Sequence, residues 1–289
     1  MSSDDVDVLG SYWTLAGEID PTGDRLWSPW DFKERVETAA EVGFSGFGLL
    51  HPDLRRVTER YSFEEMNAIF EANDIEYVEL EFLDYWFLES DDERRQESEE
   101  TKALLFEAAA ALDARHVKIG NIPRISRPVS QVEESFAELC AEAADYDTNV
   151  AFEFMAEDGV FDTFQDALDM IRRVDASNGG IVLDTWHLAK SGVDFEELRE
   201  IDLDDLAWVE VNDGYVDADM GRTEETTSHR LLPGDGEYDV PGFVSAVRDT
   251  GYDGPWGVEV LNAELRRLPM RQLYEQTYEK TMAALTASR

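Results

Sequence analysis

Apolar segments of strand length alternate with helical patterns eight times along this chain of 289 residues. Strands that alternate with helices pair in parallel, because each helix returns the chain to the same end of the sheet. Eight such units predict a (β/α)8 TIM barrel, formed as a single domain over residues 1–289. A doubly wound open sheet is the alternative, but no G-x-G-x-x-G follows the first segment to support its dinucleotide-binding version. The expected strands are Val6–Leu15, Gly46–Leu50, Ile75–Leu83, His116–Gly120, Asn149–Phe154, Gly180–Asp184, Leu206–Val211 and Trp256–Val260.

The first helix carries signals at both of its ends. Ser28 is a candidate N-cap, Pro29 suits the first helical position, and Gly43 ends the pattern after Val42. Further helical patterns cover about residues 62–73, 91–112, 130–144, 163–174, 194–200, 240–250 and 264–287. A long loop is expected between the seventh strand and the helix that begins at residue 240.

The charge balance is strongly acidic, with 65 Asp and Glu against 25 Lys and Arg and a net charge of −40. The acids are dispersed along the chain, and only five of the bases are lysines, a pattern that is similar to that of halophilic proteins in salt-rich cells. Such a balance offers no cluster of Lys and Arg for phosphate contacts. It therefore argues against a nucleic-acid partner.

Signals for a membrane or for secretion are missing from the sequence. No apolar run reaches the roughly 18 residues that a transmembrane helix needs. The acidic segment Met1–Asp7 lacks the basic and apolar regions of a signal peptide. Cys140 is the single cysteine, so no internal disulfide can form. We therefore expect a cytoplasmic protein without a membrane partner.

A carboxylate lies at the end of each of the last four expected strands: Glu153, Asp184, Glu210 and Glu259. Acidic side chains are rare in buried apolar strands unless they are paired or bind a metal. Because the carboxyl ends of barrel strands meet at one face, the four should form one cluster. Carboxylate oxygens suit hard cations such as Mg²⁺ or Mn²⁺. Four carboxylates exceed the charge of one divalent ion, so either one is protonated, one stands outside the coordination sphere, or a substrate proton is shared.

Several other polar residues are candidates for contact with a substrate. His187 follows the acid of the sixth strand by three residues and could ligate the metal, bind substrate or cap a loop. His51 has a similar place at the end of the second strand. Lys118, on the fourth strand, needs an anion if it is buried, and a substrate oxygen or the acids Glu79 and Glu81 could serve equally well.

Aromatic residues gather near the expected strand ends and could wall a polyol or a ring-shaped substrate. Packing in the core is the alternative for each of them. Trp13 is the member of this group that we expect to contact substrate, beside Trp86, Phe87 and Trp186.

Three stretches in the second half of the chain resemble the sugar phosphate isomerase/epimerase superfamily, the xylose-isomerase-like TIM barrels. They are Val150–Phe154 with its glutamate, Leu183–His187, and Arg230–Gly236 (RLLPGDG) followed by Gly251–Glu259. The last is the most specific, because members commonly read R-x-L-P-G-x-G and then G-Y-x-G-x-x-x-V-E. The resemblance covers the C-terminal half clearly and the first 120 residues weakly.

The resemblance implies one divalent metal ion, Mn²⁺, Mg²⁺ or Co²⁺, with Zn²⁺ as a further candidate. Its ligands would be Glu153, Asp184, the strand-seven residue and Glu259. The chain departs from the family at strand seven, where many members have His and some have Gln, whereas this sequence has Glu210. The departure bears on the metal's identity and affinity.

The resemblance also implies the roles of the reacting residues. Glu153 and Glu259 would face each other across the substrate and exchange its proton, while His187 and Arg230 would contact substrate oxygens. Proton abstraction beside a carbonyl needs both a base and a cation that stabilises the resulting enediolate. The residues therefore fit the chemistry that the family implies.

The leading hypothesis for function is a metal-dependent isomerase or epimerase of a keto sugar or polyol-derived carbonyl compound. A dehydratase on the same scaffold, similar to the 3-dehydroshikimate or keto-inositol dehydratases, is the second. A nuclease like the AP endonuclease IV barrels and a non-catalytic sugar-binding barrel are further alternatives. We expect an unphosphorylated carbohydrate-like small molecule as the partner, and analogy suggests a homodimer or homotetramer.

Overall fold

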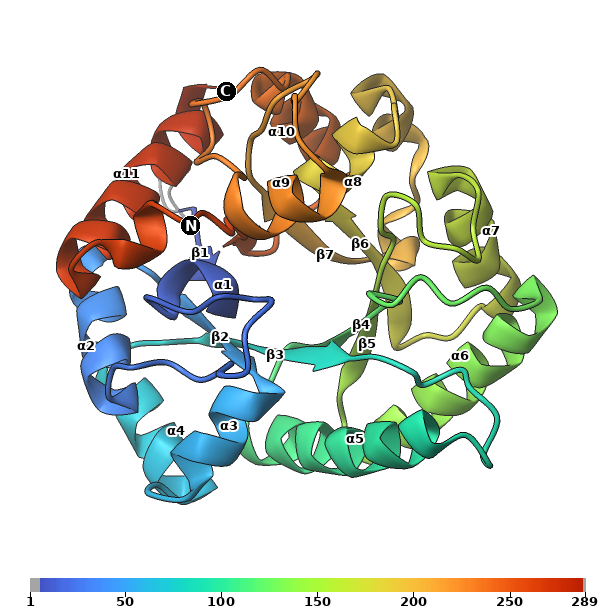
Figure 1. Cartoon of the computed structure of the whole chain (residues 1–289), viewed down its shortest axis with the longest axis horizontal. Coiled ribbons are helices and arrows are strands. Elements are labelled where there is room, and N and C mark those ends of the chain that lie inside the picture. Colours follow the sequence, from blue (N-terminus) through green and yellow to red (C-terminus); the bar gives the residue numbers. More distant parts are fainter. Residues whose placement is uncertain (1–5, 288–289) are drawn as a thin grey trace.

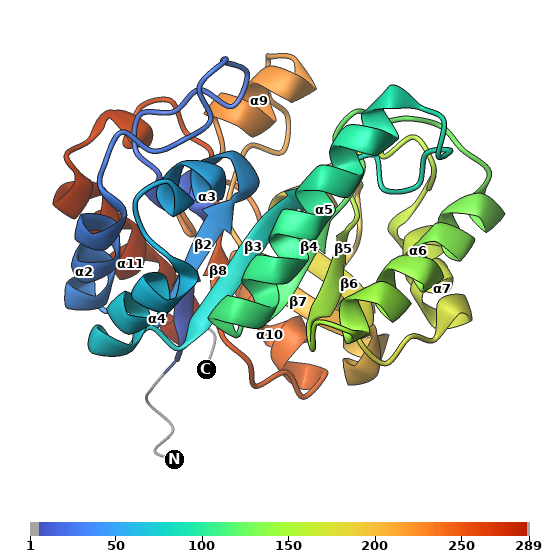
Figure 2. The same cartoon turned by 90° about the horizontal axis from the view of Figure 1, so that it is seen from below.

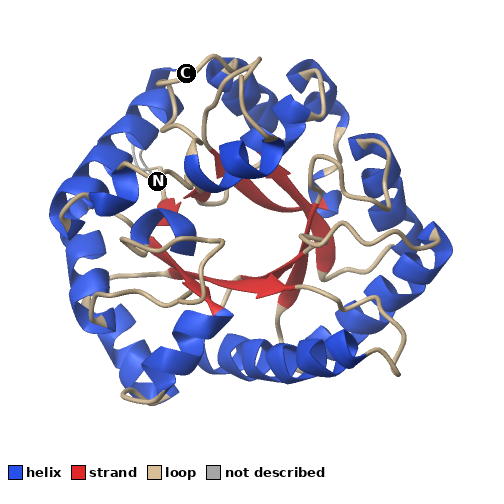
Figure 3. Ribbon diagram, viewed as in Figure 1, coloured by secondary structure: helices blue, strands red, loops and turns tan. Residues whose placement is uncertain are grey.

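Eight parallel strands close into a barrel in the computed structural model, which describes residues 6–287 (Figures 1 and 3). Each strand pairs with its neighbour in the sequence, and β1 pairs with β8 to complete the ring. The predicted TIM barrel is therefore confirmed. The strands are β1 (Val8–Gly10), β2 (Gly46–Leu50), β3 (Tyr77–Leu83), β4 (His116–Ile119), β5 (Asn149–Glu153), β6 (Gly179–Asp184), β7 (Leu206–Val211) and β8 (Trp256–Val258).

The helices form an outer ring around the strands, with short helices over the mouth of the barrel (Figures 1 and 2). A large apolar cluster lies between the strands and the outer helices. Leu49 of β2 and Phe106 of α5 are both fully buried in it. The helices are α1 (Tyr12–Leu15), α2 (Phe32–Val42), α3 (His51–Thr58), α4 (Phe63–Ala72), α5 (Glu93–Leu112), α6 (Val129–Ala144), α7 (Phe164–Val174), α8 (Thr185–Lys190), α9 (Arg222–Ser228), α10 (Val240–Asp249) and α11 (Met270–Ala287). Short 3-10 helices cover Phe195–Glu200, Leu203–Asp205 and Leu265–Arg267.

The interior of the barrel changes from apolar to charged along the strands. Four residues form an apolar cluster of their own that is separate from the outer core: Leu9, Ala151, Val182 and Trp208. Side chains two residues apart on a strand point to the same face, so Glu210 shares the interior with Trp208. The charged layer therefore lies next to this apolar layer, toward the carboxyl ends of the strands.

The first strand is shorter than the sequence predicted. The chain leaves the sheet after Gly10, and the predicted strand residues Tyr12–Leu15 form α1 instead. Thr14 holds this turn against β8, because its hydroxyl donates to the carbonyl of Val258 at 2.8 Å and accepts from the amide of Val260 at 2.7 Å. Apolar content alone did not distinguish this buried helical turn from a strand.

The predicted start of the first long helix was also wrong. Asp31 is the N-cap of α2 and accepts from the amide of Lys33, whereas Ser28 lies in the preceding loop. The hydroxyl of Ser28 donates to the carbonyl of Ala16 at 2.8 Å, and the backbone amide of Ser28 donates to Asp53 Oδ1 at 2.8 Å. Ser28 therefore anchors the loop after α1 rather than beginning a helix.

Four further differences concern helices. The sequence did not predict α3 directly after β2 or α8 directly after β6, and the segment that contains α9 was expected to be a loop. The last predicted helix, 264–287, is divided, since a 3-10 turn ends before Pro269 and α11 begins at Met270. Proline lacks the amide hydrogen that a continuous helix would need there. Within residues 6–287, every helix is too short or too polar to span a bilayer.

Candidate active site and metal centre

The four predicted carboxylates come together at the carboxyl end of the barrel. Glu153 ends β5, Asp184 ends β6, Glu210 lies near the end of β7 and Glu259 directly follows β8. The register places Asp184 opposite Glu210, and Glu210 opposite Gly257, two residues before Glu259. One carboxylate oxygen from each lies within 4.8 Å of the others, and all four side chains are buried. Four acids distant in sequence thus form a single cluster.

Asp184 is held in the cluster from three sides. Its Oδ1 accepts from the backbone amide of His187 at 2.9 Å, which makes Asp184 the N-cap of α8. Its Oδ2 accepts from Asn212 Nδ2 at 2.8 Å and from Arg230 Nη1 at 3.1 Å. Arg230 Nη1 also donates to Glu259 Oε2 at 3.0 Å, so one guanidinium joins two members of the cluster.

Arg230 owes its position to the loop that follows it. Both carboxylate oxygens of Asp213 accept backbone amides from this loop, including those of Gly234 at 3.0 Å and Gly236 at 2.9 Å. A side chain on Gly236 would collide with Asp213, and Gly234 has a φ of 85°, a conformation that favours glycine. The glycines of the RLLPGDG stretch therefore let the loop wrap around Asp213 and direct Arg230 toward the cluster.

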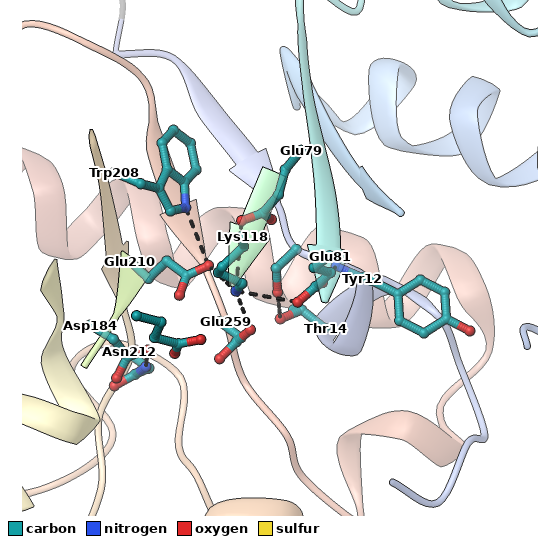
Figure 4. A network of polar contacts seen from close by, with 12 residues as sticks. Tyr12, Thr14, Glu79, Glu81, Lys118, Asp184, Trp208, Glu210, Asn212 and Glu259 are labelled. Atoms are coloured by element: carbon teal, nitrogen blue, oxygen red, sulfur yellow. Dashed lines mark hydrogen bonds and ion pairs between the residues drawn. The ribbon is translucent and has the colours of Figure 1, made fainter. Parts of the chain in front are cut away.

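Lys118 lies fully buried among glutamates on the inner side of the cluster (Figure 4). Its Nζ is 2.7 Å from Glu210 Oε1, 2.8 Å from Glu259 Oε1, 3.3 Å from Glu81 Oε2 and 3.6 Å from Glu79 Oε1. Burial opposes the ammonium charge, but the carboxylates, Glu210 foremost, raise the pKa of Lys118 well above its usual value. The structure thus shows Lys118 in ion pairs, and it does not line the cavity described below.

Glu210 has one satisfied oxygen and one that lacks a partner. Its Oε1 accepts from Lys118 and, at 3.2 Å, from Trp208 Nε1. Its Oε2 is buried and has no hydrogen-bond partner among the described residues. Burial, and then the charge of Glu259, raise the pKa of Glu210 well above its usual range. A buried carboxylate oxygen of this kind is costly unless a cation or a proton satisfies it.

The donor set fits a divalent cation in charge and in chemistry. Burial also raises the pKa of Glu153 well above its usual range, with Glu259 and Asp184 adding to the effect against the opposing charge of Lys118. When ionised, the four carboxylates outnumber the buried cations Lys118 and Arg230, and Lys118 also contacts Glu79 and Glu81. A divalent cation would offset part of this excess of negative charge, and an all-oxygen donor set suits a hard ion.

His187 presents a neutral imidazole to the site. Its Nδ1 accepts from the backbone amide of Ala156 at 3.1 Å, which places the proton of the neutral ring on Nε2. Nε2 lies 3.5 Å from Glu153 Oε1. Burial, and then the charge of Arg230, whose Nη2 is 3.2 Å from Nε2, hold the pKa of His187 well below its usual value. The neutral ring therefore places its Nε2 between Glu153 Oε1 and the guanidinium of Arg230.

A cavity of about 360 Å³ opens above the cluster. Glu153 and Glu259 form part of its floor, together with Glu81, whose pKa burial raises to about 8. The other residues that line it are Trp13, Pro21, Phe82, Ile122, Arg124, Met155, Ala156, Trp186, His187, Thr223, Thr226, Thr227, Arg230 and Leu261. The cavity thus brings Trp13, His187 and Arg230 together with both glutamates.

His51 stands apart from this group. It begins α3 and is not among the residues that line the cavity. Burial lowers its pKa to about 4, and its Nδ1 has no hydrogen-bond partner among residues 6–287. The position of His51 at the end of β2 suggested a substrate contact, but His51 does not line this cavity.

Several site residues were not singled out from the sequence. Asn212, which donates to Asp184, follows Glu210 by two residues on the same face of the chain, so the period of a strand could have identified it. Thr223, Thr226 and Thr227 belong to α9, which the sequence analysis treated as loop. Their spacing of three and four residues fits one helix face, a signal that becomes visible only once the segment is known to be helical.

A family model places the chain among known proteins. The model for the xylose isomerase-like TIM barrel matches residues 36–286. The chain belongs to this family. Inosose isomerase of Bacillus velezensis is 23% identical over 89% of this chain and 92% of its own length. The 3-dehydroshikimate dehydratase of Pseudomonas putida is 31% identical, but the match covers 43% of this chain and 19% of that protein.

Solved structures share the same fold. The IOLI protein, solved with a bound zinc atom, superposes with a TM-score of 0.81 at 19% identity over 98% of this chain and 99% of its own. This likeness concerns the fold. The two relatives named above are thus an isomerase and a dehydratase, and this chain aligns with the inosose isomerase over nearly its whole length.

Proposed function

We propose that this protein is a divalent-metal-dependent isomerase or epimerase of a keto sugar or polyol-derived carbonyl compound. The observation that carries the proposal is the buried cluster of four carboxylates, with an unpartnered oxygen on Glu210, beneath a cavity that Glu153 and Glu259 line. A bare pocket for ligand binding has no need of four buried acids, which are costly without a bound cation.

The residues that would hold the metal are Glu153, Asp184, Glu210 and Glu259. When bound, a divalent cation would supply positive charge for substrate oxygens that become negative as a proton leaves the neighbouring carbon. The all-carboxylate donor set favours Mn²⁺, Mg²⁺ or Co²⁺, and the zinc atom in the related IOLI structure keeps Zn²⁺ as a candidate.

Proton transfer falls to the two glutamates that line the cavity. One carboxylate would take the proton from the carbon beside the carbonyl, and the electron pair would move to the carbonyl oxygen. Glu153 lines the cavity, with its Oε1 3.5 Å from His187 Nε2. Glu259 is fixed by Lys118 at 2.8 Å and by Arg230 at 3.0 Å. Return of a proton to the opposite face gives an epimer, and return to the adjacent carbon gives an isomer.

His187 and Arg230 would orient the substrate during this exchange. The neutral imidazole offers its Nε2 hydrogen to a substrate oxygen, since its Nδ1 already accepts from Ala156. Arg230 ties the cluster to the cavity wall through Thr226, whose hydroxyl accepts from both Nε and Nη2. Both side chains are buried, so their geometry is fixed before substrate arrives.

A dehydratase is the second candidate, favoured by the 31% identity to the 3-dehydroshikimate dehydratase. The same initial proton abstraction would then be followed by loss of a hydroxyl from the next carbon, which leaves as water after it takes up a proton. The cavity-lining glutamate that took up the first proton, Glu153 or Glu259, could provide that proton.

Hydrogen exchange in D₂O tests the proposal directly. Metal-loaded protein should place deuterium beside the carbonyl of a keto-inositol or of a simple keto sugar, and EDTA should stop the exchange. Formation of a dehydrated product from 3-dehydroshikimate would instead support the dehydratase. Binding of sugar by metal-free protein without any exchange would contradict both enzymatic proposals and favour a binding protein.

A further inference from the structure

Helix α9 lies over the mouth of the barrel, at the end where the carboxylate cluster is found (Figures 1 and 2). Glu225 is 3% exposed and anchors the helix through an ion pair of 2.5 Å with Lys190 Nζ. Arg222 donates to the carbonyl of Lys190 at 3.3 Å and lies over the ring of Trp186. These contacts hold the helix above the cavity.

The side of α9 that faces the cavity consists of threonines. Thr223, Thr226 and Thr227 all line the cavity, and their spacing of three and four residues places them on one face of the helix. Much of the remaining wall is apolar, with contributions from Trp13, Phe82, Ile122, Met155 and Leu261. The cavity thus has one wall of hydroxyl groups, a largely apolar wall and a floor of carboxylates.

The hydrogen bonds of these threonines leave capacity for a ligand. The Thr227 hydroxyl donates to the carbonyl of Thr223 at 2.7 Å, so its oxygen can still accept. The Thr226 hydroxyl accepts from Arg230 Nε at 3.2 Å and Nη2 at 3.0 Å, so its own hydrogen can still be donated. Thr223 has no side-chain hydrogen bond among the described residues, so its hydroxyl can do both.

The cations that line the cavity are already engaged by protein carboxylates. Arg230 pairs with Asp184 and Glu259, and Arg124 Nη1 donates to Glu157 at 2.9 Å. A phosphate or carboxylate on the substrate would have to compete with these pairs. Neutral hydroxyl groups would find unused donors and acceptors on α9 at no such cost.

We propose that Thr223 and Thr227 are specificity-determining residues that bind hydroxyl groups of the substrate remote from its carbonyl. The orientation rests on the proposed function, because the carbonyl end must face the carboxylate cluster. A hydroxyl-bearing ring then lies between the threonine wall and the apolar wall. Thr226 donates its free hydrogen to the same ring while it positions Arg230.

The test combines two ligands with two protein variants. A keto-inositol carries hydroxyl groups all round its ring, whereas 2-hydroxycyclohexanone keeps only the hydroxyl beside the carbonyl. Calorimetric titration of the Mn²⁺-loaded protein with each ligand measures what the distant hydroxyls contribute. Thr223→Val and Thr227→Val, singly and together, remove hydroxyls at nearly constant volume. Thr286→Val is the matched control, because this exposed helical threonine has the same back-bond to a carbonyl, at 2.7 Å, far from the site.

The wild-type protein should bind the keto-inositol more tightly than 2-hydroxycyclohexanone. Each single variant should lower the affinity for the keto-inositol by about fivefold to tenfold and leave the affinity for 2-hydroxycyclohexanone nearly unchanged. Thr286→Val should change neither affinity. If the threonine variants lowered the affinity for both ligands equally, or for neither, the threonine assignment would be overturned and the proposed function would stand. Failure of the wild type to bind either ligand in a metal-dependent manner would overturn the proposed function itself.

Discussion

At the scale of single residues, the two glutamates that line the cavity carry the proposed chemistry. Glu153→Gln and Glu259→Gln keep size and shape but remove the base. Each should lower the rate of hydrogen exchange into a keto sugar by about a thousandfold or more, with the fold retained by circular dichroism. Glu138→Gln, an exposed change on α6, is the control for loss of one charge. Exchange at the wild-type rate in either cluster variant would remove that glutamate from the mechanism.

Lys118 gives a prediction about stability at the same scale. Lys118→Met would leave Glu210, Glu259 and Glu81 without their shared buried cation. The free energy of unfolding of the metal-free protein should fall by about 3–5 kcal/mol in urea titrations.

Lys102 offers a matched comparison for this lysine. Its Nζ lies 2.6 Å from both Glu99 and Glu142, but both of these partners are 44% exposed. Lys102→Met should therefore lower the free energy of unfolding by about 1 kcal/mol or less. An equal decrease in this free energy for the two lysine variants would show that the stability of the cluster does not depend on Lys118.

The cluster residues differ in how far the sequence could identify them. Glu153, Asp184, Glu210 and Glu259 could be found because an acid in an apolar strand is conspicuous, and barrel closure brings strand ends together. The partner of Lys118 could not be chosen, since a substrate oxygen and a carboxylate satisfy an ammonium equally well. Only the three-dimensional arrangement shows that several glutamates surround it.

At the scale of elements, the alternation of strands and helices was enough to predict the barrel. Each observed strand lies within one residue of its expected segment, because the apolar runs are bounded by breakers, although β1 ends at Gly10 and not at the predicted Leu15. The short helices α1, α3, α8 and α9 were not predicted. Each is held by contacts distant in sequence, such as the bonds of Thr14 to β8, which a local pattern does not contain. These missed helices include the one that carries the threonine wall.

Helix α9 also gives a prediction of its own. Glu225→Gln should remove the ion pair with Lys190 and loosen the helix while leaving the barrel intact. Amides of residues 222–229 should exchange with deuterium faster, and kcat/KM should fall, without a comparable loss in melting temperature. Glu224→Gln is the control, because Glu224 is 66% exposed. Unchanged exchange in α9 would show that the pair does not hold the helix.

At the scale of the whole molecule, the net charge of −40 predicts a response to salt. Like charges spread over the surface repel one another, and molar KCl screens them. The melting temperature should therefore rise steadily from low salt to molar KCl. The same should hold for metal-free protein, since the effect belongs to the surface. A flat or falling curve would contradict an adaptation to high salt.

We propose that the four buried carboxylates hold one divalent cation. Metal content and melting temperature, measured before and after EDTA and after return of Mn²⁺, Mg²⁺, Co²⁺ or Zn²⁺, test it most directly. We predict about one equivalent of metal per chain, with a melting temperature that falls on chelation and recovers on addition. Protein that contains no metal and whose melting temperature responds to none of these ions would contradict the account.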